Sequence, residues 1–408
     1  MDGGGLLTAA IFYVGFAIAY PPANLTAWRW PSSLVVGALV GVVGWRHLVA
    51  VPSLKRYMVW SLCLSAWLIV SAASAWTALA FYRGRNYSVW LVLITPGLAL
   101  LFNVPRYRKA FVGGIASGAS IYGIVAVFRM SQGRSIFDVI YPLDNYILGL
   151  NRNIAAATAL IALPLLLSRD VPDFLRRVRW PLAGLSVTWI VLSRSRLVIL
   201  AAAFGGLVWV LVQPNVAGKA RKFVAAIVVA LVVLLTIQEV GGDARIGLDR
   251  ATAGFSSDKS TNDVRRLLVR KAWHLAEENP AFGIGLGSFP GAYHPVLEEA
   301  SSTKVRRQAI NSYDHNGYAG MLAEAGFPAF LLLIGLFASL VRAGLSNRGS
   351  GSARVAFCSF AIALVYMTAA SLPGIMFAAM AVVLGAAIEN ETKARPASSV
   401  PLPRAART

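Results

Sequence analysis

The chain has 408 residues, of which 57% are hydrophobic and only 14% are charged, and its mean hydropathy is +0.63. This composition excludes a water-soluble globular protein. The formal net charge is +20, and Lys and Arg concentrate in short segments between long apolar runs. Attraction to anionic lipid headgroups explains this charge, so membrane lipids are expected partners and nucleic acid is not.

The apolar runs predict about twelve membrane-spanning helices, because a helix needs roughly 20 apolar residues to cross a bilayer. The spans are expected at residues 5–22, 33–50, 58–82, 88–103, 110–128, 153–168, 180–193, 197–213, 223–240, 316–341, 354–371 and 373–388. Segments such as Phe223–Thr236 are continuously apolar and lack the alternation of a β-barrel strand. The sequence therefore predicts an all-α polytopic membrane protein.

Basic residues mark one side of this predicted bundle. With their flanks, the loops 51–57, 104–109, 169–179, 214–222 and 342–353 and the C-terminal tail hold twenty of the 38 basic residues. Short cytoplasmic loops are enriched in Lys and Arg, so this side is expected to be cytoplasmic, with both termini there. The N-terminus lacks a basic region and a small-residue cleavage site, so we expect a retained first span.

Four regions are expected along the chain. Nine spans occupy residues 1–240, a large extracytoplasmic loop occupies 241–315, three spans occupy 316–388, and 389–408 form a disordered cytoplasmic tail. Within the loop, Asn262–Glu278 predicts an amphipathic helix. Its expected apolar face is Val264, Leu267, Leu268 and Leu275, opposite Arg265, Arg266, Arg270, Lys271, Glu277 and Glu278.

A glycine-rich run follows this helix, with Pro280 and the glycines at 283, 285 and 287. No strand precedes the run and no Lys-Ser/Thr follows it, so a tight turn is favoured over a nucleotide-binding loop.

The short outer loops and their flanks carry arginine but no lysine. The arginines are Arg29, Arg83, Arg85, Arg129, Arg134, Arg152, Arg194 and Arg196, and the only acids beside them are Asp138 and Asp144. The guanidinium group pairs with phosphate in a bidentate manner, so this set suggests an anionic, phosphate-bearing ligand. The alternative for any one arginine is that it extends to the lipid headgroups.

Arg194 and Arg196 are distinguished by the span that precedes them. Trp180–Ser193 is an apolar stretch of 14 residues, which covers roughly 21 Å of a hydrocarbon core about 30 Å thick. Both arginines are therefore expected at the outer boundary of the hydrocarbon, where charged groups usually face a polar cavity and serve function.

Of the four histidines, His47, His274 and His294 have ordinary structural explanations. His315 lies in Tyr313-Asp314-His315-Asn316, where the large loop re-enters the membrane. A neutral imidazole at that position can accept a proton, and Asp314 or Glu324 could orient it. Glu324 is nine residues further on and lies on another helical face, so spacing alone does not define a dyad.

Metal chemistry is weakly supported by this sequence. The first outer loop has no acidic residue, there is no Asp-x-Asp, and the outer carboxylates are scattered. Cys63 and Cys358 lie inside apolar runs, so neither a disulfide nor a zinc site is indicated.

Motifs over roughly residues 185–340 resemble the O-antigen ligase and O-antigen polymerase superfamily of bacterial envelope glycosyltransferases. They are Ser193-Arg194-Ser195 at the opening of a span, Arg265 and Trp273 on the loop helix, Asn279-Pro280-Ala281-Phe282-Gly283-Ile284-Gly285-Leu286-Gly287-Ser288-Phe289, His315-Asn316, and Glu324-Ala325-Gly326.

The resemblance implies a lipid-dependent (GT-C-like) glycosyltransferase bundle in the bacterial inner membrane, with its active site facing the periplasm. It implies a ligase that moves a glycan from undecaprenyl diphosphate to a sugar hydroxyl of lipid A–core, inverting the anomeric centre without metal or cofactor. His315 would be the general base, and Arg194 and Arg265 would bind the donor diphosphate, with Arg196 and Arg266 as companions. Asn316, Asp314, Glu324 and Tyr313 would support the site, and a monomer is expected.

Two other functions stay open at this point. Gly326 is followed by Phe327-Pro328-Ala329, which departs from the ligase pattern and leaves room for a polymerase that extends the glycan on undecaprenyl diphosphate. A transporter or flippase of an anionic lipid-linked solute would also use outward arginines. It should show an inverted repeat and polar positions near mid-membrane, and the sequence shows neither.

Overall fold

The computed structural model describes residues 3–19, 51–132, 146–147, 150–168, 170–193, 195–213, 259–300, 302–303, 306, 309–310, 316–369 and 374–394. These residues are helical apart from turns and a small antiparallel pair of strands, β1 (Tyr146–Ile147) and β2 (Leu150–Asn151). The predicted spans at 33–50 and 223–240 lie outside the described residues, so the expected total of twelve spans stays a prediction.

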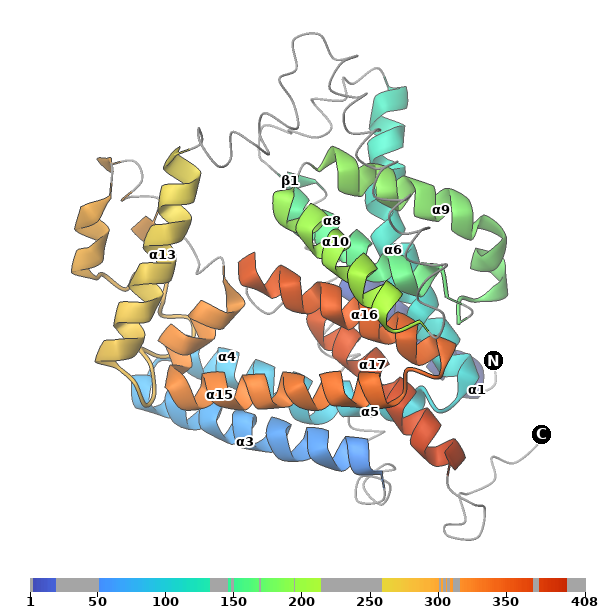
Figure 1. Ribbon diagram of the computed structural model, residues 1–408, viewed down its shortest axis with the longest axis horizontal. Helices are drawn as coiled ribbons and strands as arrows, with labels where there is room; N and C mark the ends of the chain where they lie inside the picture. The colour runs from blue at the N-terminus through green and yellow to red at the C-terminus, as the bar shows by residue number, and fades with distance from the viewer. Residues whose placement is uncertain are drawn as a thin grey trace.

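The described residues confirm an all-helical, polytopic membrane architecture. Four helices are long and apolar enough to cross a membrane, namely α3 (Pro52–Ala75), α6 (Pro105–Ser131), α15 (Gly317–Ser346) and α17 (Gly374–Ala394). Shorter apolar helices are α1 (Gly3–Ala19), α8 (Arg152–Leu166), α10 (Arg196–Leu211) and α16 (Gly351–Tyr366), which ends in the 3-10 turn η3 (Met367–Ala369). Figure 1 shows them packed as one bundle.

The span expected at 58–82 is wrong as a single helix. Helix α3 ends at Ala75, because Trp76 adopts a left-handed conformation with φ of 48°. The next helix, α4 (Ala78–Val89), starts where the Thr77 hydroxyl accepts a hydrogen bond from the Ala80 N–H. It continues through a π-helical turn, η1 (Trp90–Ile94), into α5 (Thr95–Leu101). The chain therefore reverses direction before the expected loop.

Helix α9 (Asp173–Leu192) is longer than its apolar stretch. It has 20 residues rather than the 14 expected, because it begins in the arginine-rich segment before Trp180. At about 1.5 Å per residue this is roughly 30 Å, the thickness of a hydrocarbon core. The expected depth of Arg194 therefore loses its support from a short helix.

Helices α1 and α6 run parallel and touch through glycines. A Cβ at Gly15 would lie 2.5 Å from the Phe111 carbonyl oxygen, and one at Gly114 would lie 2.1 Å from the Phe12 carbonyl oxygen. Small residues allow this approach of two backbones, which is a common device where helices associate within lipid.

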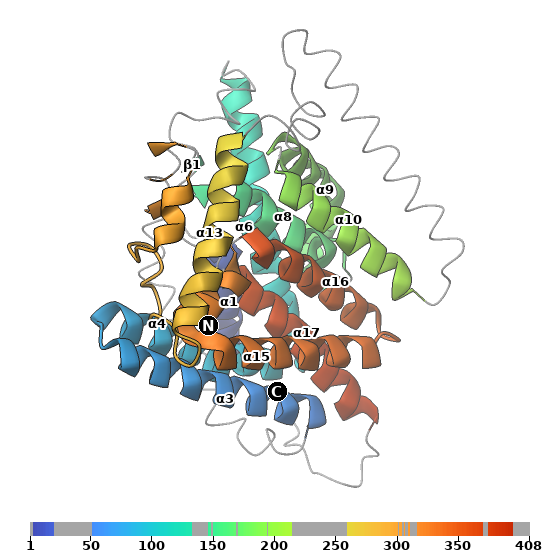
Figure 2. The ribbon, with the colours of Figure 1, turned by 60° about the vertical axis from the view of Figure 1, so that its left-hand side comes forward.

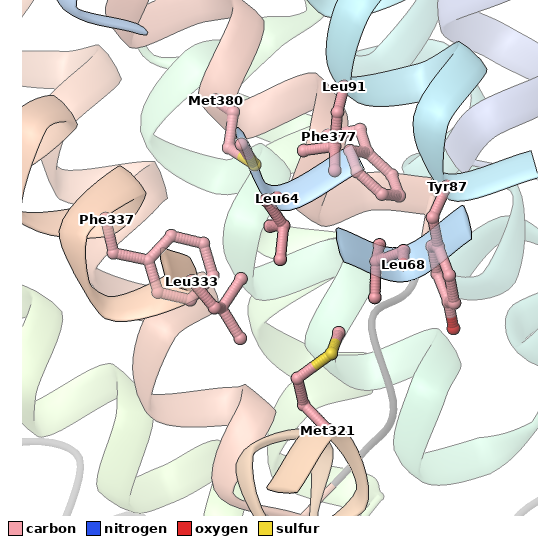
Figure 3. Close-up of a pocket in the computed structure, with 9 residues that line it drawn as sticks. All are labelled: Leu64, Leu68, Tyr87, Leu91, Met321, Leu333, Phe337, Phe377 and Met380. Carbon is pink, nitrogen blue, oxygen red and sulfur yellow. The ribbon is translucent and has the colours of Figure 1, made fainter. Parts of the chain in front are cut away.

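The bundle centre is apolar and tightly filled. Helices α3 and α15 run antiparallel, and Trp90 stacks on Phe377 of α17 with ring centroids 5.3 Å apart. A cavity of only about 10 Å³ remains between these helices (Figure 3), lined by Leu64, Leu68, Tyr87, Leu91, Met321, Leu333, Phe337, Phe377 and Met380. A space of that size holds at most one water, so the centre serves as support and not as a ligand site.

At one end of the bundle, segments from the basic loops and the C-terminal tail lie together, and the charge pattern assigns all of them to the expected cytoplasmic side. Arg108, at the start of α6, pairs with Asp170 at 3.1 Å and with Glu389 near the end of α17. The Ser53 N–H, at the start of α3, donates to Glu391 at 3.0 Å. These bonds also extend α17 to Ala394, so the disordered tail expected from residue 389 is wrong for its first six residues. We call this the basic end.

A polar module lies at the other end of α3 and α15. It contains α13 (Lys259–Glu278), a glycine-rich loop and the 3-10 turn η2 (Pro295–Glu299). The module has a small core of its own, formed by Val264, Leu267, Leu268, Ala272, Leu275, Phe289, Val296, Leu297, Ala309 and Ala323. Figure 1 shows α13 at one side of the bundle, near the start of α15, and Figure 2, with that side turned forward, shows α13 in front of the bundle.

Candidate functional site

Helix α15 starts and bends at positions set by its sequence. The Asn316 side chain caps the helix by accepting hydrogen bonds from the N–H groups of Tyr318 (3.0 Å) and Ala319 (3.1 Å). Ten residues later Gly326 interrupts the helix with φ of 79°, two residues before Pro328. The Phe327 N–H that this kink releases donates to the Pro280 carbonyl at 2.9 Å. The kink therefore binds the loop that follows α13.

The glycine-rich run forms the tight turn that the sequence predicts. Gly283, Gly285 and Gly287 all have positive φ, at 67°, 96° and 82°. A Cβ at Gly283 would lie 2.3 Å from the Glu324 carbonyl carbon, so only glycine allows this approach. The N–H groups of Ile284 and Gly285 each donate to α15 carbonyls at 2.9 Å.

The end of α3 completes the junction. The Trp67 indole N–H donates to the Ala325 carbonyl at 3.0 Å, and the Ser71 hydroxyl donates to the Phe282 carbonyl at 2.7 Å. The Trp67 ring also stacks on Phe282, with centroids 5.3 Å apart. Loop, kink and α3 are thus joined by hydrogen bonds on both sides of the α15 bend.

The Glu324 carboxylate lies beneath this loop. It accepts hydrogen bonds from the Gly287 and Phe289 N–H groups, the second at 3.2 Å. Its nearest cation is Arg83 of α4, at 4.0 Å. Glu324, expected as a supporting residue, is thereby engaged by the loop and by one of the outward arginines. The sequence did not indicate that Arg83 pairs with Glu324, because the two residues are 241 positions apart in the chain.

Lys271 is buried, and its expected place on the polar face of the helix is wrong. Its side chain has 0% exposure, its ammonium donates to the Phe289 carbonyl at 2.8 Å, and it lies 4.4 Å from the centre of the Phe289 ring. Position 271 follows 267 and 268 at helical spacing, so periodicity puts it on the inner face whatever its charge. Burial lowers the pKa of Lys271 to about 8.

Arg265 and Arg266 lie on the exposed face of α13. Their neighbour Arg270 is occupied by an exposed ion pair with Glu299. The Arg265 guanidinium lies within electrostatic range of the Tyr366 hydroxyl at the end of α16. The charge of Arg265 on the exposed face of α13 therefore reaches the end of α16.

The start of helix α10 also lies at the end of α16. It runs antiparallel to α16, because Arg354 donates to Gln213 at 2.7 Å and a Cβ at Gly205 would lie 2.4 Å from the Ile362 side chain. The backbone start of α10 at Arg196 thus lies beside the end of α16. The Arg196 side chain and the residues Arg194, Tyr313, Asp314 and His315 lie outside what the structure describes.

Two histidines with ordinary sequence explanations form a pair. The rings of His274 and His294 stack with centroids 5.1 Å apart and planes 4° from parallel. Each ring is 3.1 Å from a carboxylate, Glu277 for His274 and Glu278 for His294. Twenty residues separate the two rings in the chain, so spacing gave no signal for this contact.

In the part of the chain that the structure describes, no three His, Cys, Asp or Glu side chains form a group that could hold a metal ion. The two cysteines, Cys63 and Cys358, are free.

These features define an all-helical polytopic membrane protein whose polar module is fixed over one end of the bundle. Residues 181–334 match the family model described as O-antigen ligase. The match, which covers less than half of the chain, supports the O-antigen ligase superfamily and an activity of O-antigen ligase or polymerase type. Its range covers most of α9, all of α10 and α13, the glycine-rich loop and the kink of α15. Comparison with curated proteins found no match.

Proposed function

We propose that the protein is an O-antigen ligase of the bacterial inner membrane. It transfers a glycan from undecaprenyl diphosphate to a sugar hydroxyl of lipid A–core at the periplasmic face. The observation that carries this proposal is that the charge of Arg265 in the matched domain reaches the end of α16, beside which the backbone of α10 begins at Arg196. The family resemblance implies that both arginine pairs bind the donor.

The donor diphosphate is held by Arg194 and Arg265, with Arg196 and Arg266 as companions. The described arginines of this set, Arg265 and Arg266, are exposed and have no carboxylate among the described residues within 4.0 Å. Negative charge grows on the diphosphate as it leaves, so guanidinium groups that bind it more tightly in the transition state lower the barrier. Bidentate pairing also fixes the orientation of the leaving group.

His315 is the general base in this mechanism. It takes the proton from the acceptor hydroxyl while that oxygen forms a bond to the anomeric carbon and the bond to the diphosphate oxygen breaks. Attack from the face opposite the leaving group inverts the anomeric centre. The step needs no metal or cofactor, and a positioned base contributes typically 10²–10⁴-fold.

Asn316 and Glu324, which the structure describes, support this role for His315. Asn316 directly follows it and caps α15, so the helix start is fixed at that point. Glu324 anchors the loop above the kink, and Tyr313 and Asp314 precede the base in the chain. We assign these four residues positioning roles.

The basic end faces the cytoplasm in this proposal, and the module faces the periplasm. Ser53 of α3 lies at the basic end and Ser71 lies at the module. The eighteen helical steps from one to the other span roughly 27 Å. This is close to the thickness of a hydrocarbon core. Both termini are cytoplasmic in this orientation. We also propose, from the family resemblance, that the fold is a GT-C-like bundle and that the protein acts as a monomer.

A polymerase is the second candidate, and Gly326-Phe327-Pro328-Ala329 is the observation that favours it, because it departs from the ligase pattern. In the structure this segment forms the α15 kink and binds Pro280. The departure therefore lies within the site and not in a remote loop.

A transfer assay separates these activities. Purified full-length protein in detergent receives an undecaprenyl-diphosphate glycan, lipid A–core and excess chelator, and wild type is compared with His315→Ala and the control His274→Ala. We expect glycan on lipid A–core with wild type and with the control, and none with His315→Ala. Glycan that lengthens on the polyprenyl lipid would establish the polymerase, and absence of transfer by wild type would overturn both in favour of a transporter.

A further inference from the structure

A groove of about 590 Å³ opens at the basic end, far from the module. It lies where the starts of α1, α6 and α9 meet, and none of its lining residues belongs to the family-matched range. The parallel packing of α1 and α6 forms one wall, and the segment that enters α9 forms the other. The groove is therefore separate from the site proposed for glycan transfer.

The body of the groove is apolar. Ala9 and Phe12 of α1 face Pro172 and Phe174 across it, and the two phenylalanine rings have centroids 6.4 Å apart. Phe174 is 61% exposed, so its ring is available to an apolar occupant of the groove. This lining suits a hydrocarbon chain.

The rim of the groove is positive. Arg106 and Lys109, one turn apart on α6, line it together with Asp173. Asp173 is already paired with Arg176 at 3.1 Å. No carboxylate of the described residues lies within 4.0 Å of Arg106 or Lys109, whereas Arg108 between them pairs with two acids at the basic end. Two cations that pair with no carboxylate of the described residues thus stand at one end of an apolar groove.

We propose that this groove binds an anionic glycerophospholipid. The phosphate lies between Arg106 and Lys109, and an acyl chain lies along Phe12 and Phe174. Charge complementarity selects the occupant, because two uncompensated cations at a membrane surface attract an anionic headgroup while the apolar wall accepts its chain. The bound lipid joins α1, α6 and α9 at a point where the protein itself leaves a gap.

The test measures lipid binding by the full-length protein after detergent delipidation. Phosphatidylglycerol and phosphatidylcholine are titrated separately, and the rise in Tm and the bound mass by native mass spectrometry are recorded. The variant Arg106→Ala/Lys109→Ala is compared with Arg342→Ala/Arg348→Ala. This control removes two exposed arginines at the end of α15, outside the groove. We expect at least tenfold weaker phosphatidylglycerol binding in the first variant only.

Further arms identify the source of the phosphate. Inorganic phosphate alone should not raise Tm. Phe174→Ser should weaken binding of the diacyl lipid several-fold. Glycerol phosphate should bind neither wild type nor Phe174→Ser. Equal binding of phosphatidylcholine, an unchanged affinity in Arg106→Ala/Lys109→Ala, or stabilisation by free phosphate would each overturn the proposal. Should the double alanine variant fold poorly, Arg106→Gln/Lys109→Gln retains the side-chain length and replaces it in the same comparison.

Discussion

Two basic residues six positions apart on α13 have opposite environments. Lys271 is fully buried and hydrogen-bonded to the Phe289 carbonyl, whereas Arg265 is exposed and faces the end of α16. A buried ammonium costs stability unless its hydrogen bonds are satisfied, so Lys271 holds the module together at an energetic cost. Arg265 is not buried, and its exposed guanidinium group is available to bind a ligand.

The replacement Arg265→Lys tests the role of the guanidinium. It keeps the charge but loses bidentate geometry, so we expect a loss of transfer activity of about a hundredfold, almost as large as for Arg265→Ala. Activity is measured as glycan transferred per unit of purified protein. The matched control is Arg270→Lys on the same helix, which should retain activity because its exposed ion pair contributes little. Full activity of Arg265→Lys would refute the diphosphate role.

Lys271 should make the stability of the protein depend on alkaline pH. Its folded-state pKa of about 8 lies below the unfolded value of about 10.4, so the unfolded chain binds more protons between these values. Stability therefore rises as pH increases from about 8 to 10, by up to about 3 kcal/mol. In Lys271→Met this contribution is absent. Tm measured at pH 7.5 and 9.5 should rise more in wild type than in the variant, and identical shifts would contradict the burial.

The glycine-rich loop and the α15 kink act as one element. Gly283 approaches the backbone at Glu324, and the Gly326 kink directs the Phe327 N–H to Pro280. The hydrogen bonds of α3 to this element and the Arg83–Glu324 pair add α3 and α4, so segments from both halves of the chain are held together. The element is thus the physical link between the membrane bundle and the module.

Gly283→Ala and Gly291→Ala separate steric conflict from backbone strain. Both glycines have positive φ, but a Cβ at Gly291 meets no atom within 4 Å. Gly291→Ala should cost about 1–2 kcal/mol through strain alone. Gly283→Ala also forces the loop away from α15, and we expect a clearly larger drop in Tm together with loss of transfer. Equal effects of the two substitutions would show that the close approach is unimportant.

The sequence predicts helices better than it predicts their ends. The amphipathic helix expected at 262–278 is observed at Lys259–Glu278, because its apolar period is regular. The break at Trp76 was missed, since the run from 58 to 82 has no charged residue, glycine or proline and only scattered serine and threonine. Tertiary packing makes that break: Gly84 lets α4 fold back onto α3, where its Cβ would lie 3.3 Å from Ala72.

The candidate site was predicted in part. The glycine turn and the polar-face position of Arg265 were predicted from local rules on turns and amphipathic faces. The Asn316 cap was not predicted, although asparagine is a preferred residue at a helix start. The partners of Glu324 and Lys271 do not, because Arg83 and Phe289 reach them only through the folded arrangement of distant segments. Local patterns carry no information on such contacts.

At the scale of the whole molecule, ion pairs and the module divide the bundle into two chemically different ends. The basic end joins the starts of α3 and α6 to the end of α17. The other end carries the hydrogen-bonded loop and the exposed arginines of α13. This polarity fits a protein that takes a substrate from one leaflet and is oriented by cytoplasmic positive charge.

Labelling of single cysteines tests this orientation. In a Cys63→Ser/Cys358→Ser background, Arg266→Cys should react with a membrane-impermeant maleimide in spheroplasts, because it is exposed on α13. Gly349→Cys, in the turn between α15 and α16, should react only after the membrane is permeabilised. The reverse pattern would place the module in the cytoplasm and contradict the proposed topology.

We propose that the donor diphosphate binds between α13 and the start of α10, near the end of α16. The most direct measurement is photo-crosslinking of an undecaprenyl diphosphate analogue, with the reactive group next to the diphosphate, to full-length protein in nanodiscs. Mass spectrometry of the labelled peptides should place the label within 185–200 and 259–300, and Arg265→Ala should reduce it. Label confined to the basic end, or label in these segments that Arg265→Ala leaves unchanged, would contradict the account.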